Sequence, residues 1–438
     1  MFVVTNPPTS HRRSLVAGTV GNFVEWYEFG AYGFFATVIA ANFFSTTATS
    51  DAESLIKTYA SFALAFFFRP IGAAIFGRVG DRIGRRPTLI LVLLLMTGST
   101  TLIGVLPTYA SVGALAPWLL TLVRALQGLS AGGEFGGAVS IMTEFAPAGR
   151  RGRYGAWQSF TVALGLLAGA GLAAILATVL SKEALTDWGW RVPFLVALPL
   201  GLVALWLRLR LEETPSFTRT QTAAAQPGAG GAAEPRPAGA GEVARAIALG
   251  IGRLMGWSAA GYTFLVVMPS YLQATLNATF QQALVATVLA NAGFAASILP
   301  AGALSDRIGR RPVMMTGAAL VVVLAFPLLN LLQDKEAGTA AKGAAVFVAG
   351  LVVGLMAGPG PAMLAEMFPT RARYTGLGLA YSLSNAVFSG SAGLIITELI
   401  KQTKNIDIPA WYVVVTCAVS VVALATLRGD DHRRELRD

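Results

Sequence analysis

The side chains best able to do chemistry in this chain are charged residues that interrupt long apolar runs. They are three acids and three arginines: Glu25, Glu28, Arg69, Arg124, Glu134 and Arg253. A charge at the centre of a bilayer costs about 2.5–3.5 kcal/mol on insertion scales. We therefore expect these side chains to face a polar cavity or one another, although each could instead form a buried pair that only sets helix packing.

Two of the acids predict a proton-coupling group. Glu25 and Glu28 are three residues apart, so they share one face of a helix, with Tyr32 one turn beyond. Two neighbouring carboxylates in a low-dielectric site cannot both ionise cheaply, so one of them is expected to hold a proton near neutral pH. Coupled carboxylates titrate jointly, and the sequence leaves open which of the two carries the proton. Glu134 is a third candidate, with a structural role as its alternative.

The arginines predict a site for a carboxylate. Arg124 is always charged and offers a planar fork that matches a carboxylate, and Gln127 lies one turn away on the same helix. We expect Arg253 to face Arg124 from the second half of the chain. The full set of candidate substrate-binding residues is Arg124, Gln127, Tyr32, Gln158, Arg253, Tyr262 and Asn385. For the neutral Gln158, Tyr262 and Asn385, hydrogen bonds between helices are an equally good explanation.

Composition places the chain in a membrane. Hydrophobic residues make up 54% of its 438 residues and charged residues 13%, whereas soluble proteins have about 25% charged residues. Lipid must therefore cover most of the surface. The net charge of +10 does not indicate nucleic acid, because the arginines fall in short turns between apolar runs, as in cytoplasmic loops. The single Cys417 and the two tail histidines predict no metal site, no cofactor and no enzyme.

The apolar runs predict twelve membrane-spanning helices, because about 20 apolar residues cross a bilayer and lipid offers no partner to the backbone of an open strand. The expected spans are Leu15–Asn42, Leu55–Val79, Thr88–Leu106, Ala114–Thr143, Tyr154–Leu180, Val192–Leu209, Val243–Leu272, Leu284–Leu304, Val313–Leu332, Ala344–Ala365, Tyr374–Leu399 and Pro409–Leu427. The fold class is therefore an all-α membrane protein. The first run is too long, and with Glu25 and Glu28 too charged, for a signal peptide.

The basic residues predict the orientation. Arginine-rich loops follow the even-numbered spans; examples are Arg82, Arg85, Arg86, Arg150, Arg151, Arg208 and Arg210. All six lysines lie in the opposite loops. Because basic loops are retained in the cytoplasm, we expect both termini there, in a multi-pass protein of the cell's inner (plasma) membrane.

One sequence motif occurs twice. Residues 77–87 read GRVGDRIGRRP and residues 302–312 read GALSDRIGRRP. Each lies between two long apolar runs, which predicts two similar halves. We expect an N-terminal six-helix bundle (1–210), an Ala-, Gly- and Pro-rich cytoplasmic linker (211–242), a C-terminal six-helix bundle (243–427) and a cytoplasmic tail (428–438).

The repeated motif predicts a conformational latch, although its arginines could also serve only to fix the topology. Asp81 and Asp306 can lie against the N-terminus of a neighbouring helix, whose dipole favours an anion. Such a contact forms only when the two halves meet on the cytoplasmic side, so it breaks and re-forms in each cycle. The candidate latch residues are Gly77, Asp81, Arg82, Gly84, Arg85, Arg86, Asp306, Arg307, Gly309, Arg310 and Arg311.

These motifs resemble those of a known family. The repeated turn resembles the signature loop between the second and third spans of the major facilitator superfamily. Five further segments resemble its metabolite:proton symporter family: residues 21–30 (GNFVEWYEFG), 69–72 (RPIG), 127–134 (QGLSAGGE), 188–194 (WGWRVPF) and 211–215 (LEETP). The resemblance implies two pseudo-symmetric six-helix bundles and a basic residue at the position of Arg124. The chain departs from the family at Glu28, where Asp is usual.

The resemblance and the charges together predict a proton-coupled symporter that imports a small organic acid or zwitterion by alternating access. The family includes proline/betaine, α-ketoglutarate, citrate and shikimate permeases, and the sequence does not choose among such solutes. The alternatives are a drug–proton antiporter, an uncoupled facilitator and a non-transporting membrane sensor. The antiporter is disfavoured because Tyr154–Leu180 lacks the Gly-Pro element usual in those proteins. We expect a monomer whose partners are the substrate, the proton and the lipid bilayer.

Overall fold

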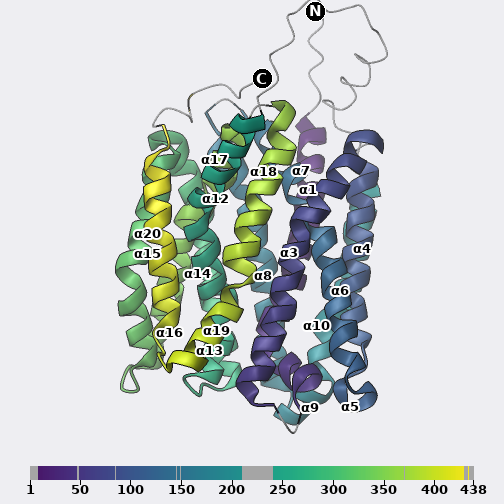
Figure 1. Ribbon diagram of the computed structural model, residues 1–438. Coiled ribbons are helices and arrows are strands. Elements are labelled where there is room, and N and C mark those ends of the chain that lie inside the picture. Colours follow the sequence, from purple (N-terminus) through teal and green to yellow (C-terminus); the bar gives the residue numbers. More distant parts are fainter. Residues whose placement is uncertain are drawn as a thin grey trace, which may run out of the picture.

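The computed structural model describes residues 8–46, 49–83, 85–144, 146–147, 149–209, 240–368, 370–428 and 433. In residues 8–18, 77–78, 80–83, 85–86, 140–141, 144, 240 and 370–374 it describes the backbone alone. The described residues form helices and short connections and no strand, so the expected all-α fold is confirmed (Figure 1).

The helices before residue 210 form six membrane-length runs. They are α1 (Pro8–Phe34) with α2 (Ala36–Ile39) and η1 (Ala40–Phe44); α3 (Asp51–Ile83); α4 (Arg85–Val105); α6 (Leu115–Ala131) with α7 (Phe135–Glu144); α8 (Arg151–Val179); and α10 (Val192–Leu209). The short helices α5 (Tyr109–Val112), α9 (Lys182–Asp187) and η2 (Gly189–Arg191) lie in the connections.

The helices after residue 239 form six more runs. They are α12 (Ala240–Tyr262) with η3 (Thr263–Val267) and α13 (Met268–Ala274); α14 (Phe280–Ile308); α15 (Arg310–Gln333); α16 (Thr339–Ala357) with α17 (Gly360–Met367); α18 (Thr370–Ser384) with η4 (Asn385–Gly390) and α19 (Ala392–Thr403); and α20 (Ile408–Ala425). The twelve expected spans are thus present, each within a few residues of its predicted position.

Length and hydropathy alone pick out nine of these runs within the described residues. The other three contain buried acids or breaks in the regular helix. The run of α1 contains Glu25 and Glu28, that of α6 and α7 bends at Gly132, Gly133 and Glu134, and that of α12 and α13 changes to a π-helix at Thr263. Similar π-helical stretches, which widen the helical turn, interrupt the first run at η1 and the eleventh at η4.

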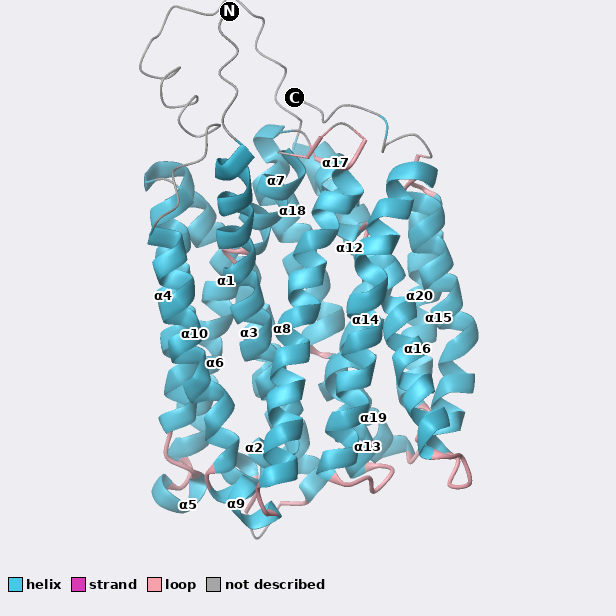
Figure 2. Ribbon diagram, turned by 180° about the vertical axis from the view of Figure 1, so that it is seen from behind, coloured by secondary structure: helices cyan, strands magenta, loops and turns pink. Residues whose placement is uncertain are grey.

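The helices pack in two groups that meet along a central interface. In the first group α1 packs on α8, α3 on α6 and α4 on α10; in the second α14 packs on α16, α15 on α20 and α12 on α18. The groups meet where α8 contacts α14 and where α3 contacts α18 and α19 (Figures 1 and 2). The expected linker (211–242) and tail (428–438) lie almost entirely outside the described residues.

Glycines bring two helices of the first group into backbone contact. A Cβ added at Gly128 of α6 would overlap the carbonyl oxygen of Ala65 in α3, and one at Gly132 would overlap that of Arg69. Small residues four apart allow this close approach. The contact fixes the relative positions of Arg69 on α3 and Arg124 on α6, two of the charged residues singled out above.

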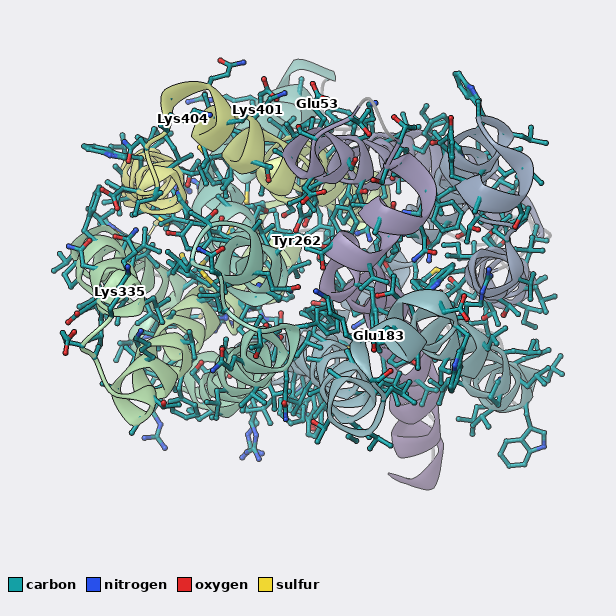
Figure 3. The ribbon with its side chains drawn as sticks, turned by 90° about the horizontal axis from the view of Figure 1, so that it is seen from below. Glu53, Glu183, Tyr262, Lys335, Lys401 and Lys404 are labelled. Carbon is teal, nitrogen blue, oxygen red and sulfur yellow. The ribbon has the colours of Figure 1, made fainter. Side chains whose placement is uncertain are left out.

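A vestibule opens at one end of the bundle. Its volume is about 1190 Å³, and both groups line it, with Ser50 and Lys182 on one side and Ser270, Lys401 and Lys404 on the other. We call this the open end and the opposite end, at the start of α8, the closed end. Figure 3 looks at the open end, where Lys401 and Glu53 lie together at the rim with Nζ and Oε1 3.3 Å apart.

Candidate functional site

The first group of helices buries most of the charged residues that the sequence singles out. Glu25 of α1 pairs with Arg69 of α3, with Oε1 and Nη2 3.3 Å apart. Both side chains are almost fully buried. The Arg69 guanidinium also lies 4.4 Å from the ring centre of Phe29 and 4.2 Å from that of Phe66. Aromatic faces attract a cation in this geometry, so the two rings stabilise the Arg69 guanidinium together with Glu25.

Glu28 lies one turn from Glu25 but has different partners. Its Oε2 accepts a hydrogen bond of 2.6 Å from the hydroxyl of Thr100 in α4. Its side chain has no exposed surface, and Oε1 has no hydrogen-bond partner among the described residues. The two acids thus share a helix, as expected, while Glu25 is neutralised by an arginine and Glu28 is bound only by a neutral donor.

Arg124, Gln127 and Tyr32 come together as the sequence predicts. Nη1 of Arg124 donates to Oε1 of Gln127, and the guanidinium lies 4.1 Å from the ring centre of Tyr32. Nε2 of Gln127 donates to Oγ1 of Thr100 over 2.7 Å. Arg124 is fully buried, and its Nε and Nη2 have no acceptor within the described part of the chain. These two groups share one edge of the guanidinium, which is the fork that binds a carboxylate.

Glu134 pairs with an arginine that the sequence assigned to a loop. Arg208 of α10 is buried, with Nη2 bonded to Oε1 of Glu134 and Nη1 donating to the Leu89 carbonyl over 2.7 Å. The expected sixth span, Val192–Leu209, already included Arg208, although the charge pattern counted it with the basic residues of the loop that follows; the structure places it in the last turn of α10 with its side chain turned inward. A side chain at Gly21 would overlap Arg208, so α1 also packs tightly on the pair.

Arg253 does not face Arg124. Its Nη2 donates to Oγ1 of Thr426 over 2.9 Å and its Nε to the carbonyl of Ala423 over 3.4 Å. The face of α12 that carries Arg253 packs on α20 within the second group, so the expectation that Arg253 faces Arg124 is wrong.

Gln158 bonds between helices, which was the alternative explanation for it. Its Nε2 lies 3.4 Å from Oδ1 of Asn22, and Asn22 donates to the Gln158 carbonyl and to Thr161. These bonds join α8 to α1, so the described geometry gives Gln158 a structural role between two helices of one group.

Tyr262 and Asn385 line a small cavity between the groups. Its volume is about 30 Å³ and its walls include Trp26 and Tyr381, so it has room for a water or two but not for an amino acid. The Tyr262 hydroxyl has no partner in the described residues. Asn385 donates to the Tyr381 carbonyl and accepts from Ser389, each over 2.9 Å.

An aromatic layer separates the vestibule from Arg124. Phe62 stacks on Tyr32, with ring centres 5.7 Å apart, and lies 6.2 Å from Tyr262 of the other group. Beside it, the hydroxyls of Tyr59 and Ser270 bond across the interface over 2.5 Å. The vestibule therefore ends at this aromatic layer and does not reach the charged residues, so the path is closed at its middle.

The second copy of the repeated motif closes the other end. Oδ1 and Oδ2 of Asp306 accept hydrogen bonds from the backbone N–H groups of Gly152 and Arg153, over 2.7 and 2.9 Å. These are the first free amides of α8, where the helix dipole favours an anion. Arg310 bonds both Asp306 and Glu366, over 2.7 and 3.0 Å.

The other expected latch residues divide into two sets. Gly309 has a φ of 99°, a conformation that suits glycine, and turns the chain between α14 and α15. Arg307 and Arg311 are exposed. The first copy of the motif is described mainly as backbone. Gly84 and the side chains of Asp81, Arg82, Arg85 and Arg86 lie outside the described residues, as does the environment of Gly77.

Comparison with known proteins places this geometry in a family. The profile of a family described as sugar (and other) transporter matches residues 14–229, and that of the Major Facilitator Superfamily matches residues 246–438. The proline/betaine transporter of Escherichia coli K12 is 32% identical over 426 residues, covering 96% of this chain and 84% of that protein. The α-ketoglutarate permease of the same organism is 35% identical over 413 residues, covering 93% and 91%. The chain belongs to the major facilitator superfamily.

Solved structures agree on the fold. The proton:xylose symporter XylE bound to 6-bromo-6-deoxy-D-glucose superimposes with a TM-score of 0.79 at 18% identity, covering 95% of each chain. The expected major facilitator fold, with twelve spans in two six-helix bundles, is thereby confirmed. The protein is a multi-pass membrane transporter and not an enzyme.

Thr100 is a site residue that the sequence did not predict. The signal was a cluster of hydroxyls in an otherwise apolar run, since residues 97–101 read TGSTT. Hydroxyls in the middle of a membrane helix serve its own backbone or a neighbouring helix. Ser99 and Thr101 bond their own helix, over 2.7 and 2.8 Å, and Thr100 alone of these three bonds a carboxylate.

Proposed function

We propose that this protein is a proton-coupled symporter that imports a small organic acid or zwitterion by alternating access. The fork of Arg124 carries the proposal. It is fully buried, it has no carboxylate within 4 Å in the described part of the chain, and the edge formed by Nε and Nη2 has no acceptor there. A buried arginine without an anion is costly, so a substrate carboxylate is its natural partner.

Relatives of this chain support the substrate class. They include transporters named for proline and betaine, for ectoine and proline in Corynebacterium glutamicum, and for α-ketoglutarate. All of these solutes carry a carboxylate. The vestibule wall carries three lysines, Lys182, Lys401 and Lys404, and one acid, Asp51. Lys401 pairs with Glu53 at the rim, and the remaining positive charge also favours the approach of an anionic group.

The acids of α1 supply the proton coupling in this proposal. Glu25 already has Arg69 as its partner, so Glu28 is the better proton carrier of the two. Protonation of Glu28 removes one negative charge near Arg124 and so favours binding of a substrate anion there. The proton also neutralises one charge of the load that crosses the membrane.

We further propose that residues 1–210 and 243–427 are the two moving bodies and that both termini lie in the cytoplasm of a cell whose inner membrane holds the protein. The closed end is then cytoplasmic and the vestibule faces outward. Asp306, Arg310 and Glu366 hold the inner side shut through the N-terminus of α8. One chain supplies both walls of the path, which supports transport by a monomer.

The test is uptake into proteoliposomes with an imposed pH gradient. Labelled proline, glycine betaine, α-ketoglutarate, citrate and shikimate are offered in parallel, with the wild type and Glu28→Gln compared. Accumulation of at least one solute that collapses when the gradient is removed, and that Glu28→Gln abolishes, is the expected result.

Two outcomes contradict the proposal. Equilibration without accumulation, unaffected by Glu28→Gln, identifies an uncoupled facilitator. No uptake of any of the five solutes in a folded, correctly oriented preparation removes the substrate class proposed here.

A further inference from the structure

Four polar side chains from three helices form a continuous chain of hydrogen bonds. Arg124 of α6 donates to Gln127, Gln127 donates to Thr100 of α4 over 2.7 Å, and Thr100 donates to Glu28 of α1 over 2.6 Å. All four side chains are fully buried. We call this set the Arg124–Glu28 relay.

Chemistry fixes the direction of the relay. Arginine has donors only, so Gln127 must present its carbonyl oxygen to Arg124 and its NH₂ group to Thr100. The Thr100 oxygen then accepts from Gln127, and its single hydrogen is left for Oε2 of Glu28. Every hydrogen bond therefore points from the arginine to the carboxylate, an arrangement in which the bonds strengthen one another.

Both ends of the relay are open. At one end, Nε and Nη2 of Arg124 have no acceptor among the described residues; at the other, Oε1 of Glu28 has no donor there. A buried polar atom without a partner carries a free-energy cost that a bound group removes. One end suits a carboxylate and the other suits a proton.

We propose that Thr100 and Gln127 are positioning residues that couple a substrate carboxylate on Arg124 to a proton on Oε1 of Glu28. This inference rests on the proposed symport. Ionised Glu28 offsets the charge of Arg124 through the relay, so an added carboxylate leaves two anions and one cation in a water-poor site. A proton on Oε1 restores neutrality without breaking the bond from Thr100 to Oε2.

The other described buried charges near Glu28 are already paired, so the charge balance at Arg124 and Glu28 depends on the relay. Glu25 and Glu134 are the other described buried acids of the first half, but each is paired, with Arg69 of α3 and with Arg208 of α10 respectively. From α8, the neutral Gln158 and Thr161 face α1 at Asn22. Arg124 is therefore the cation near Glu28 that has no acid of its own in the described residues.

The test is an infrared titration of the full chain in lipid nanodiscs, which needs no transport. The stretching band of the protonated carboxyl is followed from about pH 4 to pH 10, and Glu28→Gln identifies the part that belongs to Glu28. Thr100→Val keeps the shape and removes the hydroxyl. It is expected to move the half-protonation point of Glu28 up by about one pH unit, because the ionised form loses a charge-assisted hydrogen bond.

Matched variants serve as controls. Thr100→Ser keeps the hydroxyl and Thr101→Val makes the same exchange at a neighbour whose hydroxyl bonds its own helix. Both are expected to titrate with the wild type. If Thr100→Val fails to fold in a thermal melt, Gln127→Met is measured instead, with a smaller shift expected in the same direction. A folded Thr100→Val, or failing it Gln127→Met, that titrates with the wild type overturns the relay.

Transport of labelled proline and α-ketoglutarate tests the coupling itself. Thr100→Val is expected to lower proton-driven accumulation about tenfold while solute exchange without a gradient falls by less than about threefold. Equal losses in both assays contradict coupling through Thr100. If the wild type transports none of the five solutes named above, the proposed function fails while the infrared result on the relay still stands.

Discussion

The two halves of the protein line their shared path with different chemistry. The first half buries the pairs Glu25–Arg69 and Glu134–Arg208 and the Arg124–Glu28 relay. The second half faces them with neutral groups such as Tyr262 and Asn385. Its described buried arginines, Arg253 and Arg310, contact α20 and the closed end instead. We infer that the first half handles charge while the second shapes and closes the path.

The largest expected effect comes from breaking a buried pair of the first half. Glu134→Gln leaves Arg208 charged and unpaired, which is expected to lower the free energy of unfolding by about 3–5 kcal/mol. Chemical denaturation in detergent micelles measures it. Replacing both partners, with Glu134→Leu and Arg208→Met, is expected to restore much of the loss. A Glu134→Gln variant as stable as the wild type refutes this account of the pair.

The next effect concerns Arg124 against its neutral neighbours across the path. Arg124→Lys keeps the charge but loses the fork, so uptake of the transported solute is expected to fall about 100-fold. Asn385→Ala in the second half is expected to reduce uptake by less than about fivefold, because it removes neutral hydrogen bonds only. Comparable losses from the two variants would erase the division between the halves.

Closure can be tested at the repeated motif. Asp306→Asn removes the negative charge at the N-terminus of α8, and the population open at that end is expected to rise about fivefold. Spin labels are attached at Arg153→Cys and Arg307→Cys, since both positions are exposed and the native Cys417 is buried. Electron paramagnetic resonance measures the distance between the labels and so the open population. An unchanged distance distribution contradicts the latch.

A smaller effect is expected at Tyr262. Its hydroxyl has no partner among the described residues and lines the central cavity, so Tyr262→Phe is expected to raise the apparent KM about threefold by removing one neutral hydrogen bond to the solute. The control is Tyr412→Phe, whose hydroxyl already donates to the Phe388 carbonyl over 2.8 Å. Kinetics of labelled-solute uptake distinguish the two.

The smallest effect is expected at the rim. The Glu53–Lys401 pair is exposed, so Glu53→Gln is expected to change uptake by less than about twofold. A larger change would mean that the rim pair takes part in closing the vestibule.

The sequence predicts much of the fold and part of the site. Apolar run length locates the spans, and helical spacing brings Arg124, Gln127 and Tyr32 together. Helical spacing does not say which neighbour a face meets, which is why Arg253 was assigned to the path while it contacts Thr426. The charge pattern grouped Arg208 with the cytoplasmic basic residues and did not predict its pair with Glu134, because a count of basic residues cannot detect an acid that draws an arginine inward.

Other features depend on tertiary structure alone. Thr100 is one of several hydroxyls in its run, and only packing of α4 against α1 and α6 selects it. The placement of Asp306 against a helix N-terminus followed from the repeated motif, because the dipole argument applies to any helix start that the halves bring near it. The identity of that helix, α8, needed the structure.

The π-helical stretches η1, η3 and η4 interrupt the first, seventh and eleventh spans; η1 and η3 contribute to the vestibule wall and η4 to the small central cavity. Their wider turns give the tips of these helices at the open end pivots of their own. The mouth of the transporter can then narrow by swinging three helix tips, with little rearrangement of the annular lipids. We expect gating at the open end to respond less to bilayer thickness than opening of the closed end, which must separate α8 from α14 along their length.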